Sequence, residues 1–310
     1  MLFEYAVEPE LVATWVEPRT GRYFIERFGI GSPRLISRFP KRWKRRVWDA
    51  WQAVEKRNGR DVDRQRRRME TLIQHLSSAM VERRRAVWDA ERSWMENALD
   101  QEVPFHAVLA RHNSTGDPRV LVADELDEST AGWAAPHGRA VARRAETIAD
   151  AVGGMLRIAT DVIFVDPYFA PGRRDFVRVI AACVKAGCEG RSVGPATVRI
   201  FSSDREANGT HEHFRTECRE RLPREFPPGQ AVVIRRLGER TGGERLHNRY
   251  VLTELGGVSL GAGLDEREAG ATDDLNLLAS DQYRRRWAQY AGEPPGFDQP
   301  EDPITIVGSR

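Results

Sequence analysis

The stretch Asp161-Val162-Ile163-Phe164-Val165-Asp166-Pro167-Tyr168-Phe169 is an apolar run that ends in turn residues. Short runs of β-branched and aromatic residues with such an ending are typical of buried strands. An amphipathic segment over residues 174–186 follows, and we predict that it is helical. A second apolar run covers residues 197–201. Strand, helix and strand in this order predict an α/β fold with a largely parallel sheet.

The same alternation continues on both sides of this unit. The further elements that we predict are a helix over 141–156, a helix over 213–222, a strand over 231–234, a hairpin of 250–253 and 258–260 around Gly256-Gly257, and a closing helix over 281–290. Residues 304–307 resemble a strand within a stretch rich in Pro and Gly. We therefore predict an α/β domain over residues 101–290 and a Pro/Gly-rich tail over 291–310.

Residues 1–100 have a different character, and we predict a basic, mostly helical N-terminal domain there. The segment 40–99 repeats apolar residues at helical spacing, with a break at Asn58-Gly59. After it, residues 105–110 and 120–122 flank a turn-rich run, which predicts a β-hairpin. The apolar positions that define the helical period are Met69, Leu72, Ile73, Leu76 and Met80.

Positive charge is concentrated in the predicted helices. The whole chain has a net charge of +2, but residues 41–92 contain 16 Lys and Arg against 8 Asp and Glu. Arginines such as Arg45 and Arg67 could neutralise phosphates of nucleic acid or of an anionic membrane, or could form a solvated helix face. The clusters are Lys41-Arg42, Lys44-Arg45-Arg46, Arg64, Arg66-Arg67-Arg68 and Arg83-Arg84-Arg85.

Tryptophans accompany these arginines, and we interpret them as packing residues. Trp43, Val47, Trp51 and Val54 form one stripe at helical spacing, which is more typical of a core than of a platform for bases. The others are Trp48, Trp88 and Trp94.

Composition excludes several classes of protein. A chain of 310 residues with 40% hydrophobic and 30% charged residues is typical of a globular protein, and no apolar run reaches the ~18 residues of a membrane-spanning helix. The first residues lack the basic-then-apolar pattern of a signal peptide, so we expect a cytoplasmic protein. Cys183, Cys188 and Cys218 match no zinc spacing and predict no disulfide framework. We expect neither a metal nor a cofactor.

The segment Arg245-Leu246-His247-Asn248-Arg249-Tyr250-Val251-Leu252-Thr253-Glu254 suggests a phosphate site. Residues two apart on a strand share a face, so His247 and Arg249 should project together. A guanidinium can hold phosphate oxygens in a fork while an imidazole attacks phosphorus or moves a proton. Glu254 could return to the imidazole and fix its orientation. Gly261 and Gly263 give the backbone room to approach a phosphate.

This segment resembles the signature of the phospholipase D superfamily, His-x-Lys-x4-Asp followed by Gly-Ser-x-Asn. His247 matches the histidine; Arg249 stands at the lysine, Glu254 at the aspartate and Gly261-Ala262 at Gly-Ser. The preceding strand–helix–strand unit supports the resemblance, which covers roughly the C-terminal half of the chain. It implies a phospholipase D-like sheet flanked by helices.

The segment is also similar to the phospholipase D-like C-terminal domain of microtubule-interacting-and-transport proteins. That domain has a His-Asp-Arg element and a Gly-x-Gly-Leu-Asp turn, to which His247-Asn248-Arg249 and Gly261-Ala262-Gly263-Leu264-Asp265 correspond. Because those domains bind membranes and do not cleave phosphodiesters, the resemblance implies phosphate binding more directly than catalysis. Asn248 is expected to contribute to binding.

Two functions follow as hypotheses. The first is a metal-independent nuclease of a bacterial defence system, with His247 as nucleophile, Arg249 as phosphate clamp and basic helices holding nucleic acid. Only one motif is visible, so two chains would pair as a homodimer, each supplying one His247, or the site would be incomplete. The second is an inactive module that binds nucleic acid, membrane phosphates or a partner protein of a defence operon.

Three further residues and one further activity are weaker candidates. His211 and His213 form the only other histidine pair, and we expect them in an exposed loop before a helix. Asp166 could support the site as a carboxylate, but a helix N-cap is the preferred interpretation. Lipid hydrolysis ranks last because no amphipathic membrane-binding segment is evident.

Overall fold

The chain divides into two compact α/β units. The computed structural model describes residues 1–310 except 56–61, 79, 84–85, 192–193, 206–208 and 310. One unit is Leu2–Pro136 and the other is His137–Arg310 with Met1, and each contains its own sheet. The predicted α/β class is confirmed, but the division falls after Pro136 and not near residue 100. The predicted break at Asn58-Gly59 and two cluster residues, Arg84 and Arg85, lie outside the described residues.

The Leu2–Pro136 unit has a four-stranded sheet in the order β2-β1-β3-β4, and its neighbouring strands are parallel. The helices predicted within residues 1–100 are present, but they do not form a separate domain, because they pack on a sheet that continues to Val122. Its elements are β1 (Phe3–Val7), α1 (Pro9–Thr14), α2 (Pro18–Ile25), β2 (Arg34–Ile36), α3 (Trp43–Glu55), α4 (Val62–Ser77), α5 (Trp94–Leu99), β3 (Ala107–Ala110), β4 (Val120–Val122) and the short 3-10 helix Ala123–Glu125.

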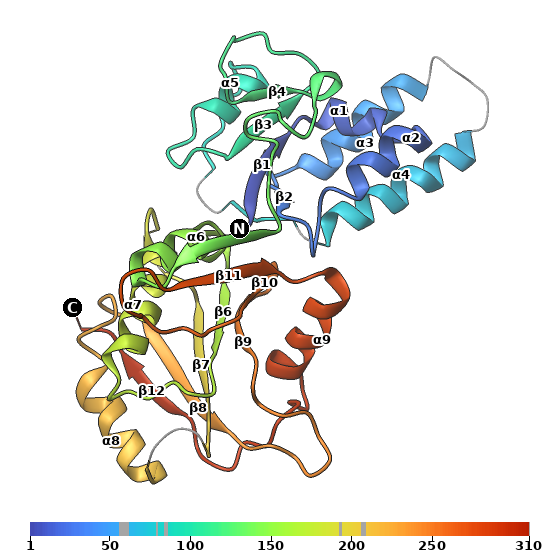
Figure 1. Cartoon of the computed structure of the whole chain (residues 1–310). Coiled ribbons are helices and arrows are strands. Elements are labelled where there is room, and N and C mark those ends of the chain that lie inside the picture. The colour runs from blue at the N-terminus through green and yellow to red at the C-terminus, as the bar shows by residue number, and fades with distance from the viewer. Residues whose placement is uncertain (56–61, 79, 84–85, 192–193, 206–208, 310) are drawn as a thin grey trace. The chain divides into compact units, whose positions relative to one another are not determined.

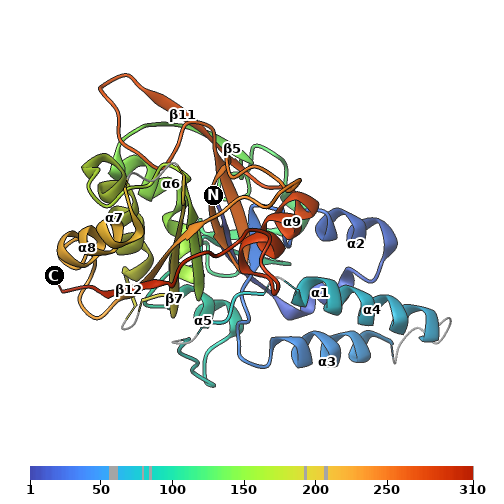
Figure 2. The ribbon, with the colours of Figure 1, turned by 90° about the horizontal axis from the view of Figure 1, so that it is seen from below.

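Strand alternation in β1 explains how this sheet separates two apolar cores. Tyr5 and Val7 face a core shared with Trp43 and Leu72, whereas Ala6 faces a second core with Phe39. Helices α1 to α4 cover the first face and α5 lies on the other, with α3 and α4 side by side (Figure 1, Figure 2).

Three residues of the predicted stripe, Trp43, Val47 and Trp51, are buried, whereas the fourth, Val54, is 54% exposed. Trp43 and Trp51 are buried in the first core, and the Trp43 Nε1 donates a hydrogen bond to the Val7 carbonyl at 2.7 Å. The indole thus packs against apolar neighbours and still satisfies its one donor.

The predicted hairpin over residues 105–122 is wrong. β3 and β4 run parallel, with Leu109 opposite Leu121. All four residues of β3 are buried because it lies between β1 and β4 with both faces covered. The turn-rich run makes a loop in which Asn113 accepts from the Gly116 N–H and donates to the Asp117 carbonyl.

The His137–Arg310 unit has an eight-stranded mixed sheet in the order β12-β8-β7-β6-β9-β10-β11-β5. Strands β6, β7 and β8 are parallel; β9 runs antiparallel to β6 and begins an antiparallel half. Its elements are β5 (Gly138–Ala142), α6 (Ala145–Ile158), β6 (Asp161–Val165), α7 (Arg174–Cys188), β7 (Thr197–Ser203), α8 (His211–Arg221), β8 (Ala231–Leu237), β9 (Arg249–Thr253), β10 (Gly256–Leu260), β11 (Thr272–Leu277), α9 (Ser280–Ala291) and β12 (Ile304–Val307).

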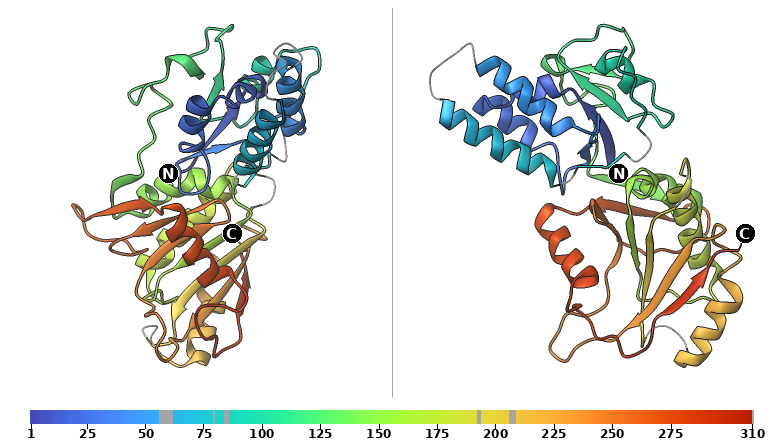
Figure 3. Two further views of the ribbon diagram at one scale, coloured as in Figure 1. Left: turned by 90° about the vertical axis from the view of Figure 1, so that its right-hand side faces the viewer. Right: turned by 180° about the vertical axis from the view of Figure 1, so that it is seen from behind.

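Helices cover both faces of this sheet. α6, α7 and α8 lie on one side and α9 lies on the other (Figure 1, Figure 3). The β9–β10 hairpin passes directly under α9, where a side chain on Gly257 would lie 2.5 Å from Leu252 and 3.4 Å from Tyr283. A β-carbon at position 257 would therefore require the Leu252 and Leu278 side chains to shift.

Three features of this unit differ from prediction. β5 precedes α6, so the predicted helix over 141–156 begins too early. β11 was missed because its sequence, TDDLNL, is rich in Asp and Asn. Residues 304–307 are a strand that pairs with β8, so 291–310 belongs to the sheet and is not a separate tail. None of the described helices is both long and apolar enough to cross a membrane.

Candidate phosphate site

Sheet topology brings the loops after β6 and β10 together with the start of β9. Val165, the last residue of β6, pairs with Tyr250, and Leu260, the last residue of β10, pairs with Arg249. From β6 the chain proceeds through β7 and β8 in one direction, whereas β9 to β11 extend in the other. Ligands of α/β sheets bind preferentially outside such a switch in strand order. Asp166, Arg249 and Gly261 therefore share this edge.

Arg249 is the central cation at this edge. Its side chain is partly buried, and its Cζ lies 5.0 Å from the centroid of the Tyr168 ring. Its Nε is buried and has no hydrogen-bond partner among the residues that the structure describes. A buried donor without an acceptor costs free energy, so this nitrogen can gain from an incoming oxygen. The role predicted for Arg249 stays compatible with its position.

Asp166 is the buried carboxylate beside Arg249. It is 1% exposed and accepts hydrogen bonds from the backbone N–H of Leu264 at 2.8 Å and of Tyr168 at 3.0 Å. Burial raises the pKa of Asp166, although these hydrogen bonds and the charge of Arg249 act in the opposite direction. Because the side chain ties the loop after β6 to the loop after β10, the preferred helix N-cap interpretation is wrong: α7 begins later, at Arg174.

The turn after β10 is held by internal carboxylates. Asp265 is 2% exposed in its side chain and forms ion pairs with Arg143 and, at 2.7 Å, with Arg267. Gly263 has a φ of +133°, and a β-carbon there would lie 2.9 Å from the Asp265 Oδ1 and 3.3 Å from the Asp166 Oδ2. Glycine at 263 thus lets the backbone lie against two carboxylates.

The N–H groups at the start of this turn are already occupied. Asp273, on β11, is 7% exposed and accepts from the backbone N–H groups of Gly261 and Ala262 at 3.1 Å. The predicted backbone contacts of Gly261 with phosphate would therefore compete with a carboxylate of the same chain.

His247 and Asn248 lie just before β9 and not on it. His247 is exposed, and its backbone N–H donates to the Arg245 carbonyl at 3.1 Å; Asn248 is partly buried. The expectation that His247 and Arg249 share one strand is therefore wrong, because β9 begins at Arg249. Both residues still lie at the same edge of the sheet, two positions apart.

Glu254 lies at the opposite end of β9. Its carboxylate accepts hydrogen bonds from the Thr160 N–H at 2.7 Å, the Thr160 hydroxyl at 2.8 Å and the Asp161 N–H at 3.0 Å. The prediction that Glu254 orients the imidazole of His247 is wrong, because the five residues of β9 separate the two. Glu254 instead accepts hydrogen bonds from backbone N–H groups at the start of β6.

The remaining predicted residues lie elsewhere. Arg45, on α3, and Arg67, on α4, are exposed residues of the Leu2–Pro136 unit, and the Nε of Arg45 lies 3.7 Å from an Asp49 carboxylate oxygen. His211 and His213 lie in the first turn of α8 and not in a loop; the His211 Nδ1 lies 2.7 Å from Glu301.

Sequence reasoning missed the carboxylates that shape this edge. The turn sequence around Asp265 gives no sign of its ion pairs, and Asp273 lies on β11, whose polar sequence does not predict a strand. The three cysteines are free, and no group of three His, Cys, Asp or Glu side chains within the described ranges could hold a metal ion. Comparisons of the chain with protein-family models, with curated proteins and with solved structures found no match.

Proposed function

We propose that the chain binds nucleic acid and that its His137–Arg310 unit holds a backbone phosphate at Arg249. The observation that carries this proposal is the partly buried guanidinium with an unsatisfied Nε at the switch in strand order. A phosphate oxygen would supply the missing acceptor through a charge-assisted hydrogen bond. His247 and Asn248 directly precede Arg249 in the chain, and we expect them to contact the sugar or phosphate next to the one that Arg249 holds.

The positions of the residues at this edge support phosphate binding better than they support catalysis. The carboxylate expected to orient the imidazole, Glu254, is bonded at the far end of β9. No residue that the structure describes takes the place of Glu254 beside the exposed His247 ring, and misplacement of a catalytic group by about 1 Å costs on the order of 100-fold in rate. The resemblance to phospholipase D-like domains supports a phosphate ligand in either case.

The exposed arginines of the other unit support a polyanionic ligand. Arg45 and Arg67 are solvent-exposed on α3 and α4, where guanidinium groups add salt-dependent affinity for phosphates. Arg83 cannot contribute, because it forms a buried ion pair with Glu4 at 3.1 Å.

The first experiment measures binding of a fluorescein-labelled single-stranded oligonucleotide by anisotropy at several salt concentrations. Arg249→Ala should weaken binding by roughly 10-fold or more, since a hydrogen bond to a charged group contributes ~1.5–3 kcal/mol. The matched control is Arg245→Ala, which removes an exposed arginine four residues earlier. Equal losses in both variants, or no binding by the wild type, would refute the assignment of Arg249. Stronger binding to anionic phospholipid vesicles would reassign the site to lipid phosphate.

Hydrolysis of phosphodiesters is the second candidate, favoured by the exposure of His247 at the same edge as Arg249. In this reading two chains pair so that each supplies one imidazole, as in a homodimeric nuclease of a bacterial defence system. Cutting of DNA or RNA in EDTA that disappears in His247→Ala would establish it. Cutting that persists in His247→Ala would exclude His247 as the nucleophile.

A further inference from the structure

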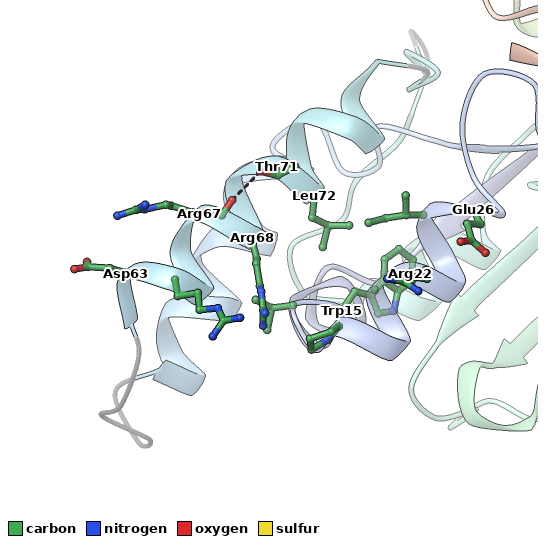
Figure 4. Close-up of a pocket in the computed structure, with 13 residues that line it drawn as sticks. Trp15, Arg22, Glu26, Asp63, Arg67, Arg68, Thr71 and Leu72 are labelled. Carbon is green, nitrogen blue, oxygen red and sulfur yellow. Dashed lines mark hydrogen bonds between the residues drawn. The ribbon is translucent and has the colours of Figure 1, made fainter. Parts of the chain in front are cut away.

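The Leu2–Pro136 unit contains a groove that is separate from the phosphate site. It lies between the end of α1, helix α2 and the first half of α4, and its volume is about 850 Å³ (Figure 4). Trp15, Ile25 and Leu72 supply apolar surface, and Arg22 and Arg68 are among the cations that line it. Ligand pockets of roughly 300–1,000 Å³ with an apolar lining and a few polar groups are typical of small-molecule sites.

The apolar part of the groove is rigid. Trp15 is 2% exposed and its ring stacks on Phe24 with the centroids 4.2 Å apart. α2 is pressed against the end of α1, so that a β-carbon on Gly21 would lie 2.2 Å from the Trp15 carbonyl oxygen. Close packing of this kind fixes the two helices and preserves the shape of the groove.

The cations of the groove differ from other arginines on the same helices. Arg66, on α4 but not lining the groove, forms an ion pair with Glu70 at 3.2 Å. Within the described part of the chain, no carboxylate lies within 4.0 Å of the guanidinium groups of Arg22 or Arg68. Arg68 is partly buried and reaches from α4 toward the facing helices, whereas Arg67 extends away from them (Figure 4).

An unpaired guanidinium beside apolar surface favours an anion as its neighbour. Partial burial removes some of the water that would otherwise solvate Arg68, and a phosphate or carboxylate would replace it. Glu26 and Asp63 also line the groove, but Asp63 extends away from it in Figure 4. The charge complementarity therefore points to a ligand with one anionic end.

We infer that this groove binds a small amphiphilic anion. Its phosphate or carboxylate group would contact Arg68 and Arg22, and its apolar body would cover Val16 and Ile25. A nucleoside monophosphate and a fatty acyl anion share this chemistry. The inference does not depend on Arg249, because the groove and that residue belong to different units.

The test uses 8-anilinonaphthalene-1-sulfonate, an aromatic body with one anionic group, titrated into the full chain by calorimetry. We expect saturable binding that Arg68→Gln weakens roughly 10-fold. The matched control is Arg66→Gln, on the same helix, which should leave affinity within about 2-fold because its guanidinium pairs elsewhere. Thr71→Trp should abolish binding, because Thr71 is exposed and lines the groove, so that an indole there fills it. Circular dichroism melts confirm that each variant is folded.

The outcomes separate clearly. Absence of saturable binding in the wild type, equal losses in Arg68→Gln and Arg66→Gln, or wild-type affinity in Thr71→Trp would overturn the inference. Displacement of the probe by adenosine 5′-monophosphate alone would identify a nucleotide ligand, and displacement by dodecanoate alone would identify an acyl anion. Displacement by neither would count against a site for such ligands.

Discussion

Replacing Glu254 tests whether this residue stabilises the fold or takes part in catalysis. Its carboxylate accepts three hydrogen bonds, two from Thr160 and one from the Asp161 N–H, at 2.7–3.0 Å. Bonds to charged groups contribute ~1.5–3 kcal/mol each, and partial exposure reduces this to about 1 kcal/mol each, so Glu254→Ala should cost about 3 kcal/mol. For a unit of this size that corresponds to a fall in Tm of roughly 6–12 °C.

The assay is thermal and urea unfolding followed by circular dichroism at pH 7. Glu254→Gln is the matched control: it keeps one carbonyl acceptor and should lose less stability than Glu254→Ala. At a temperature where both variants are folded, oligonucleotide binding, and any cutting, should equal those of the wild type. A variant that melts like the wild type but loses binding or cutting would refute the structural role and restore the catalytic one.

Three further predictions follow from buried polar groups. Arg83→Met should destabilise the Leu2–Pro136 unit by about 3 kcal/mol in urea unfolding, because it leaves the Glu4 carboxylate, whose side chain is 10% exposed, without its partner. The double variant Arg83→Met, Glu4→Gln should recover part of this loss. Asn97→Ala should cost about 2–3 kcal/mol in the same assay, since the Asn97 amide is 3% exposed and bonds backbone groups, including the Asp89 N–H at 2.7 Å; a loss under 0.5 kcal/mol would contradict this. Because burial raises the pKa of Asp166, the protonated carboxyl favours the folded state at acid pH, and this contribution to stability falls as the pH rises. The free energy of unfolding of the wild type, relative to that of Asp166→Asn, should therefore decrease between pH 3 and pH 7. An increase over that range would contradict the raised pKa.

The central strands could be predicted from the sequence because they are buried and apolar. The run at 161–165 is β6 with the same bounds, and the helix after it starts at Arg174 as expected. The last two strands at the β5 end of the sheet were harder to predict: β5 is exposed at three of its five positions, and β11 contains Asp and Asn beside its leucines, so neither gives an apolar run. For β3 the strand itself was predicted but its pairing was not. All four of its residues are buried, so the sequence lacks the alternation that would distinguish a hairpin from parallel pairing.

The site was predictable in part, through short-range spacing. The predicted hairpin brings Gly261 back to the edge where Arg249 begins β9, but His247 precedes β9 and does not share a strand with Arg249. Spacing failed for Glu254, since a strand of five residues carries the next side chain about 17 Å away. The contact of Asp166 with Leu264 joins residues 98 positions apart, and no local pattern encodes such a pair.

The carboxylate of Asp273 acts as an internal anion for the backbone N–H groups of the turn after β10. It accepts hydrogen bonds from two backbone N–H groups, whereas Asp265 is paired with Arg143 and Arg267 and Asp166 lies beside Arg249. Each carboxylate at this edge is therefore matched by a backbone N–H or a guanidinium of the same chain, so that the three together join β11 and the loops after β5, β6 and β10.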